Sequence, residues 1–344
     1  MPSGTRTLNR PKANLSHPAF IIADHMVSKS SPADASGENR LSLIQDPNTT
    51  EPAPAAIPPE PDDHGPVGLE TISPSRAGDF KQCPLLFRFR AIDRLPEPVT
   101  PALARGTTAH LALERLFDLD AAERTPERLF DLFRQEWTKL RLTDEYANLF
   151  ADREEERQWG IDSLRVVANY LEMEDPTGFD PVEREMMISE DLGKVVVRGI
   201  LDRLDETPDG KLVIVDYKTG SGPPERYAIP AFFALKTYAM LVRRRLGRTP
   251  VELRLLYLGS SSVYSIEVDH NTIEGVERHI LALVDAIRNA LANDHFPPRP
   301  SVLCRWCAFQ HLCPEGQAYA KPEPALPLVE PEPPSATKTN ETLA

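Results

Sequence analysis

The segment GKLVIVDYKTG, residues 210–220, places an uninterrupted apolar run, Leu212 to Val215, directly before Asp216 and Lys218. Such a run is typical of a strand that is covered on both faces of a sheet. An ionised carboxylate at the end of a buried strand needs a metal or a cationic partner, because burial removes its hydration. Taken alone, the Asp-x-Lys pattern is typical of a solvated salt bridge, so its meaning depends on the residues that accompany it.

A second carboxylate is predicted across a hairpin from the first. Asp202 interrupts the apolar stretch 195–204, and a Pro-Asp-Gly turn at 208–210 separates that stretch from the next strand. Hard oxygen ligands of this kind suit Mg²⁺ or Mn²⁺. These ions can activate a water and offset the charge that develops when a phosphodiester is hydrolysed. Asp202 and Asp216 are therefore candidate metal ligands, and Lys218 would hold the attacking water or a phosphate oxygen.

The wider pattern predicts an α/β fold with a mixed central sheet of about five strands flanked by helices. Strands are expected at 182–189, 195–204, 212–218, 252–258 and 263–268, and helices at 76–90, 101–119, 126–140, 154–171, 228–246 and 272–292. Ser73 and Pro74 are a helix-start signal, and Cys83 is expected inside the helix that follows. The first four helices would form an N-terminal helical section, in which the helix with His110 closes over one face of the sheet.

Proline divides the chain into three parts. Of the 34 prolines, 11 fall in residues 1–68 and 6 in residues 321–344. Segments rich in Pro, Ala, Ser and Glu cannot bury enough apolar surface to offset chain entropy, so both tails are expected to be disordered. Residues 69–320 are expected to form the folded domain.

The charge of the chain limits its partners. The net charge is −13, and the core is acidic even without the tails. A general basic coat for nucleic acid is absent, so a DNA contact would need a local basic patch or metal ions. No apolar run is long enough to span a membrane and the chain does not start with a secretory pattern, which predicts a cytoplasmic protein. There is no G-x-x-x-x-G-K-[ST] phosphate loop, so a helicase would be a separate partner.

Four short motifs follow one another along residues 71–314. They are Ser73-Pro74-Ser75-Arg76 with Cys83-Pro84, Gly106-Thr107-Thr108-Ala109-His110, Gly199-Ile200-Leu201-Asp202-Arg203 and Asp216-Tyr217-Lys218-Thr219-Gly220. In this order they resemble the motifs of RecB-type exonucleases within the PD-(D/E)xK nuclease superfamily. The resemblance implies that His110 is a metal ligand carried by a helix, that Asp202 and Asp216 are metal-binding carboxylates, and that Lys218 is catalytic. It further implies that the backbone carbonyl of Tyr217 is a metal ligand.

Two further residues enter through the same resemblance. Glu183 resembles a glutamate that these proteins often carry on the first core strand, as a further metal ligand. The family usually has a Q-x-x-x-Y element on the helix after the lysine strand; Tyr238 is in place here as a candidate catalytic residue, but Ala234 stands where the Gln would be. This departure puts the rate or polarity of cleavage in doubt more than metal binding. Outside these motifs, His110 and Tyr238 would be typical of packed helical side chains.

The chain has four cysteines, which are Cys83, Cys304, Cys307 and Cys313. The last three form a C-x₂-C-x₅-C pattern, and a cysteine more than 200 residues upstream is poor spacing for a zinc finger but suits a thiolate-ligated [4Fe-4S] cluster. RecB-type nucleases of the AddB and Cas4 kind resemble this layout. Structural zinc and free or disulfide-bonded thiols are the alternatives.

Three functions are compatible with these patterns. The first is a metal-dependent DNA exonuclease that acts on single-stranded ends in DNA repair or recombination. The second is a non-catalytic DNA-end binding or scaffold protein, and the third is a Cas4-like nuclease in spacer acquisition. Trp306, Phe309 and Tyr227 are candidate surfaces on which bases would stack, although each is more typical of a core.

Overall fold

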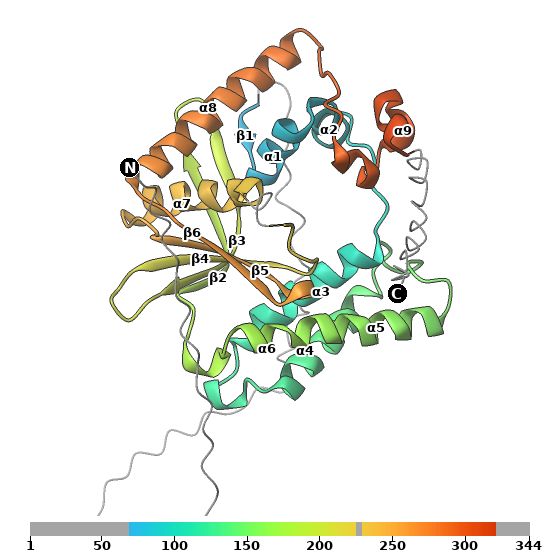
Figure 1. Cartoon of the computed structure of the whole chain (residues 1–344), viewed down its shortest axis with the longest axis vertical. Helices are drawn as coiled ribbons and strands as arrows, with labels where there is room; N and C mark the ends of the chain where they lie inside the picture. The colour runs from blue at the N-terminus through green and yellow to red at the C-terminus, as the bar shows by residue number, and fades with distance from the viewer. Residues whose placement is uncertain (1–68, 225–228, 321–344) are drawn as a thin grey trace, which may run out of the picture. The chain divides into compact units, whose positions relative to one another are not determined.

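A mixed six-stranded sheet is the frame of residues 69–224 and 229–320, which are the residues that the computed structural model describes (Figure 1). The strands are β1 (Thr71–Ile72), β2 (Glu183–Asp191), β3 (Val196–Glu206), β4 (Leu212–Lys218), β5 (Glu252–Tyr257) and β6 (Ser262–Glu267). Their order is β1-β3-β4-β5-β6, and β2 pairs with β3. The β1–β3 and β4–β5 pairs are parallel and the other pairs are antiparallel. The predicted mixed sheet is confirmed, with the two-residue β1 as an addition that is too short to show a periodic pattern.

Helices cover both faces of the sheet (Figure 1). On one face lie α1 (Pro74–Gln82), α7 (Phe233–Leu246) and α8 (His270–Ala292). On the other lie α3 (Pro101–Leu116), α4 (Pro126–Leu140), α5 (Arg153–Ala168) and α6 (Tyr170–Met173). The short helices α2 (Pro84–Phe87) and α9 (Pro314–Ala320) complete the set, with single turns at 88–92, 121–123, 176–178, 229–232, 258–260, 302–306 and 310–312.

The apolar run of β4 is explained by this layering. Leu212 and Ile214 pack into the cluster beneath α7 and α8, whereas Val213 and Val215 pack into the cluster beneath α3 to α6. Because both faces are covered, alternation of apolar and polar residues disappears in this strand. The predicted buried strand is confirmed.

Three helices begin with the same local signal. Ser73, Thr100 and Thr125 each precede a proline, and the hydroxyl of each accepts a hydrogen bond from a backbone N–H of the first turn. The hydroxyl satisfies an N–H that has no partner within the helix, and proline loses nothing at the first position. The sequence pattern therefore fixes where α1, α3 and α4 start.

The predicted continuous helix at 76–90 is wrong. The chain leaves the α conformation at Cys83, where ψ is 115°, and α1 therefore ends before this residue. A proline ring clashes with a helical residue in front of it, and Pro84 has this effect on Cys83. The second part of the expected helix is formed by α2 and a π-helical turn at Arg88–Ile92. Cys83 thus lies at a break between helices and not inside one.

The pairing of β3 leaves an opening in the sheet. Along one edge, β3 pairs with β1 at Val196 and Val197 and with β4 from Arg203 to Glu206. Between these two ladders, residues 199–202 pair with no further strand on that edge within the described part of the chain. Asp202 is the last residue before β4 joins this edge.

Residues 1–68, 225–228 and 321–344 lie outside the described residues, and with them the two predicted tails, Tyr227 and the first residue of the predicted helix at 228–246. Among the residues that are described, no helix has both the length and the apolar character that crossing a membrane requires.

Candidate active site

His110 lies on α3 and reaches the sheet at the backbone of Tyr217. Its Nε2 atom donates a hydrogen bond to the Tyr217 carbonyl oxygen over 3.0 Å, and the two rings meet edge to face with centroids 5.8 Å apart. A carbonyl oxygen can only accept, so in the neutral imidazole the proton is on Nε2 and the lone pair is on Nδ1. The carbonyl that was expected to bind a metal therefore also orients the histidine.

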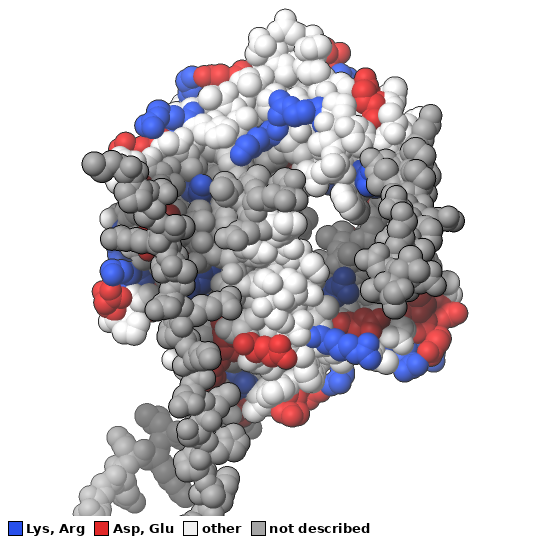
Figure 2. Space-filling model, viewed as in Figure 1, with Lys and Arg blue, Asp and Glu red and all other residues white. Residues whose placement is uncertain are grey.

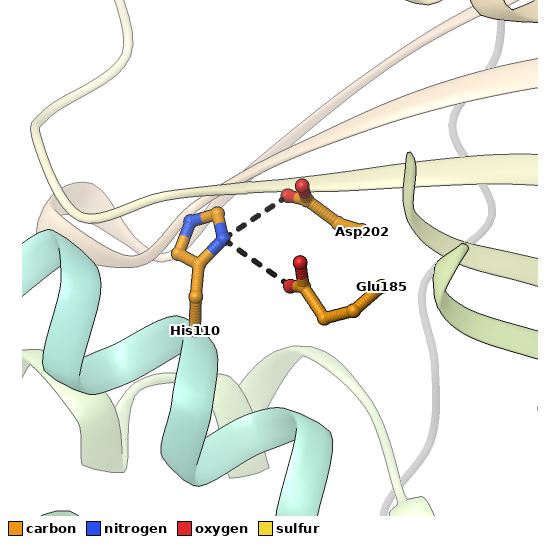
Figure 3. A group of neighbouring side chains, drawn as sticks. All are labelled: His110, Glu185 and Asp202. Atoms are coloured by element: carbon orange, nitrogen blue, oxygen red, sulfur yellow. Dashed lines mark ion pairs between the residues drawn. The ribbon is translucent and has the colours of Figure 1, made fainter. Parts of the chain in front are cut away.

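Two carboxylates from neighbouring strands point toward Nδ1 of His110 (Figure 3). This nitrogen lies 3.4 Å from Oδ2 of Asp202 and 4.0 Å from Oε1 of Glu185. The backbone N–H of Tyr217 donates to Oδ2 of Asp202 over 3.0 Å, which fixes the carboxylate. One ligand atom from each of the three side chains lies within 4.8 Å of the others, and residues 69–224 and 229–320 contain no other such group of His, Cys, Asp or Glu.

Glu185, and not Glu183, is the strand β2 residue in this group. Arg184 pairs with Arg203 and Met186 with Leu201, so Glu185 lies directly opposite Asp202. Glu183 is exposed at the start of β2, opposite Leu204. The signal that could have found Glu185 is the hairpin between β2 and β3, in which Leu192 donates to Val195. Glu185 lies seven residues before Leu192 and Asp202 seven residues after Val195, so the hairpin register pairs them.

Asp216 and Lys218 form an ion pair at the end of β4. The carboxylate of Asp216 is buried, whereas the Lys218 side chain is 44 % exposed. Oδ2 of Asp216 contacts the ammonium group and makes no hydrogen bond elsewhere within the described residues. The expected ion pair is present, and it lies beside Asp202, whose charge acts on Asp216.

The positive charge of His110 and Lys218 does not offset the burial of the carboxylates in this site and the repulsion between them. Burial raises the pKa of Glu185 to about 7, and Asp202 raises it further while His110 opposes the shift. Burial also raises the pKa of Asp216 to about 6, again with Asp202 adding to the effect and Lys218 opposing it. A divalent cation would remove this deficit, because it favours the ionised form of every carboxylate around it.

The donor set fits a hard divalent cation. It consists of one imidazole nitrogen and the carboxylate oxygens of Glu185 and Asp202, and oxygen ligands are what Mg²⁺ and Mn²⁺ prefer. Ligand atoms on opposite sides of such an ion are about 4.2 Å apart, given a metal–oxygen distance of about 2.1 Å. The ligand atoms of His110, Glu185 and Asp202 lie within 4.8 Å of one another. These side chains therefore need to move only slightly closer together to bind an ion.

A buried arginine, Arg203, holds the side chain of Tyr217 next to the site. Arg203 is 1 % exposed, and its guanidinium donates to both carboxylate oxygens of Glu174 at 2.7 and 2.8 Å and to the Tyr217 hydroxyl at 2.6 Å. It also donates to Asp205 at 3.0 and 3.2 Å. Tyr217 is thus held by its hydroxyl, its N–H and its carbonyl, so the two atoms that contact Asp202 and His110 have a fixed position.

Tyr238 is placed against Gly199 rather than in the His110 group. A Cβ atom on Gly199 would lie 2.7 Å from the Tyr238 hydroxyl and 3.2 Å from Cδ of Pro74. Three of the sequence motifs therefore meet in one packing contact between β3, α7 and α1. Ala234 is half-buried, one turn before Tyr238 on α7.

The four cysteines line one cavity. Backbone N–H groups donate to three of the sulfur atoms: Arg299 to Cys83 at 3.3 Å, Ser301 to Cys304 at 3.4 Å and Gly316 to Cys313 at 3.3 Å. The sulfur atoms do not form a close group, and no three of them lie within 4.8 Å of one another. A tetrahedral zinc site would need sulfur atoms about 3.8 Å apart, from a zinc–sulfur distance of about 2.3 Å.

The two described candidates for base stacking, Phe309 and Trp306, differ in exposure. Phe309 is buried and packs against Phe89 with ring centroids 5.3 Å apart, so it has the core position that was the more typical alternative to a stacking surface. Trp306 is 76 % exposed.

Comparison with known proteins identifies the family. The family model described as "PD-(D/E)XK nuclease superfamily" matches residues 71–314. Among solved structures, one described as a "Putative exonuclease" from Eubacterium rectale is 13 % identical with a TM-score of 0.42, covering 69 % of this chain and 87 % of its own. The protein SSO0001 is 16 % identical with a TM-score of 0.36, covering 71 % and 86 %. No curated protein matches the chain. Since the matched residues include the whole sheet and every ligand candidate beside it, the chain belongs to the PD-(D/E)XK nuclease superfamily.

Proposed function

We propose that this protein is a Mg²⁺- or Mn²⁺-dependent exonuclease that hydrolyses phosphodiester bonds at single-stranded DNA ends. The observation that carries the proposal is the convergence of His110, Glu185 and Asp202 beside the Asp216–Lys218 ion pair. Metal ions held there would supply the activated water and the counter-charge that the reaction requires. DNA repair or recombination, with a separate helicase that feeds the site, is the setting we infer.

Each residue has a distinct role in this proposal. Asp202, Asp216 and His110 hold the metal, with Glu185 in the place that the sequence pattern gave to Glu183. The Tyr217 carbonyl holds the imidazole through Nε2, so in this arrangement it orients His110 and does not bind the ion that Nδ1 faces. Lys218 is a compact cation that would hold the attacking water or a non-bridging oxygen of the scissile phosphate. We assign Tyr238 to packing against Gly199.

Degradation of end-labelled single- and double-stranded DNA tests the proposal. With Mg²⁺ or Mn²⁺ present, the wild type should release nucleotides, and Asp216→Ala and Lys218→Ala should each lower the rate about 100-fold or more. Equal rates for all three proteins would exclude the reaction.

We further propose that Cys83, Cys304, Cys307 and Cys313 hold a [4Fe-4S] cluster. All four line one cavity, and N–H donors to three sulfurs suit thiolate ligands. A cluster also spaces its thiolates more widely than a single zinc ion does, which agrees with the separation of the sulfur atoms. Protein prepared without oxygen should be brown, with absorbance at about 400 nm.

Ala234 favours a second candidate, a DNA-end binding protein without activity. The missing Gln removes a polar group from the helix that follows the lysine strand. Binding of labelled DNA without degradation under any of the metal conditions would support this candidate.

A further inference from the structure

Basic side chains that form no ion pair with a described carboxylate lie where α1, α7 and α8 pack together. Lys81 at the end of α1 places its ammonium group 4.4 Å from the ring centre of Phe233, the first residue of α7. The ring of His279 on α8 lies 5.5 Å from the same ring. Lys236, one turn along α7, is close enough to act electrostatically on Lys81. We call Lys81, Lys236, His279 and Arg299 the α1–α7 basic surface.

The two lysines of this surface differ from the other lysines that the structure describes. Within residues 69–224 and 229–320, neither Lys81 nor Lys236 forms an ion pair, whereas the other four lysines there do.

Arg299 adds a guanidinium group at the same place. Its guanidinium donates to the backbone carbonyl of Lys81, and its N–H donates to Cys83. The surface is therefore tied to the break between α1 and α2 that carries a cysteine. In the space-filling view, Lys and Arg side chains lie over the region of α1 and α2 (Figure 2).

A local concentration of positive charge on an acidic protein is a site to which an anion is attracted. The chain as a whole carries −13, so a polyanion would be repelled from most of its surface and attracted only to a local concentration of positive charge. The Lys81 ammonium group and the His279 ring both lie against the ring of Phe233, so this ring is already in contact with side chains. Both observations favour contacts to phosphate groups over contacts to bases.

We infer that the α1–α7 basic surface binds phosphate groups of the single-stranded DNA substrate outside the metal site, without regard to base sequence. The inference rests on the proposed nuclease function for the identity of the strand. Lys81 and Lys236 make the main contacts because they are partly exposed and form no ion pair with a carboxylate of residues 69–224 or 229–320. They hold the strand while the metal site acts on its end.

The salt dependence of binding tests this surface. The full-length protein is titrated against fluorescein-labelled oligo-dT by anisotropy in EDTA, at several NaCl concentrations. Each phosphate contact to a single strand contributes about 0.7 to the slope of log affinity against log salt. The Lys81→Gln/Lys236→Gln variant should therefore lose about 1.4 from the wild-type slope, and each single variant about half of that.

A control of equal charge change is Lys194→Gln/Lys211→Gln, whose lysines pair with Asp285 and Asp209. This control should keep the wild-type slope. The Lys81→Arg/Lys236→Arg variant, which keeps the positive charge, should also keep it, and this shows whether the charge of the two side chains determines the slope. An unchanged slope in Lys81→Gln/Lys236→Gln, or a wild type that does not bind oligo-dT, would overturn the inference.

Hydrolysis is scored separately, with Mg²⁺ and end-labelled DNA. A wild type that binds through these lysines but does not cleave would contradict the exonuclease and leave the surface intact. A wild type that cleaves, with a slope that the lysine variants do not change, would contradict the surface alone.

Discussion

Two glutamates on β2, Glu183 and Glu185, show that a motif can identify the strand that contributes a ligand without identifying the residue. The sequence pattern indicates a glutamate on the first core strand and selects Glu183, whereas Glu185 lies opposite Asp202 and reaches His110. The two are separated by one strand repeat, so periodicity assigns them to the same face. Glu185 has a φ of 43°, a local departure from extended backbone that no sequence pattern predicts. Only the hairpin register distinguishes them.

A pair of isosteric substitutions tests this assignment. Glu185→Gln should weaken Mn²⁺ binding at least about tenfold, because it removes one charged ligand from the group. Glu183→Gln makes the same chemical change at an exposed position and should leave the affinity unchanged. Titration calorimetry with Mn²⁺ measures both. Equal losses in the two variants, or a loss in Glu183→Gln alone, would contradict the role of Glu185.

The raised pKa values of Glu185 and Asp216 predict how stability depends on pH when metal is absent. Their folded-state pKa values of about 7 and about 6 exceed the unfolded values of about 4. The folded state therefore holds more protons over that range, and the contribution of these groups to the free energy of unfolding falls as pH rises from about 4 to about 7. In EDTA, the free energy of unfolding of the Glu185→Gln variant should fall less with rising pH than that of the wild type.

Thermal unfolding at pH 5.5 and 7.5 checks this expectation. Comparison with the variant isolates the contribution of Glu185 from that of the other carboxylates of the chain. Mg²⁺ or Mn²⁺ should raise the melting temperature more at pH 7.5 than at pH 5.5, because protons compete with the metal for the same oxygens. A metal effect that is independent of pH would show that the shifted carboxylates are not its ligands.

At the scale of elements, local signals predict where helices start and which strand is buried, but not where a helix is interrupted. The caps before α1, α3 and α4 and the apolar run of β4 agree with the structure because each depends on neighbouring residues. The break at Cys83 was also local, since it precedes a proline, but helical periodicity continues across it. The length of β1 leaves no periodicity to detect.

The contact of Gly199 with Tyr238 and Pro74 joins three elements and explains why a motif on β3 begins with glycine. Gly199→Ala should lower the free energy of unfolding by about 1–3 kcal/mol, because the new methyl group would overlap the tyrosine. Urea denaturation measures the loss. Tyr238→Ala removes the overlapping atoms, so Gly199→Ala should cost much less in that background. Additive losses would contradict the packing role of Tyr238.

At the scale of the whole molecule, the candidate site combines residues from α3, β2, β3 and β4. The sequence predicts His110, Asp202, Asp216 and Lys218 through motifs whose order is known from other proteins, not through any local rule. Which atoms meet depends on backbone contacts, such as the Tyr217 carbonyl that holds His110. The basic surface between α1, α7 and α8 could not be predicted, because Lys81 and Lys236 come together only when two helices pack.

The four cysteines connect the two ends of the folded chain. Cys83 lies before the sheet and the other three follow α8, so a cluster would close a loop of more than 200 residues and stabilise the fold by restricting the unfolded chain. Because all four thiolates would serve one cluster, the effects of removing them cannot be additive. Cys83→Ser and Cys83→Ser/Cys304→Ser should lose the same absorbance and melt at nearly the same temperature. Four independent thiols would instead give two small losses that add, with no colour to lose.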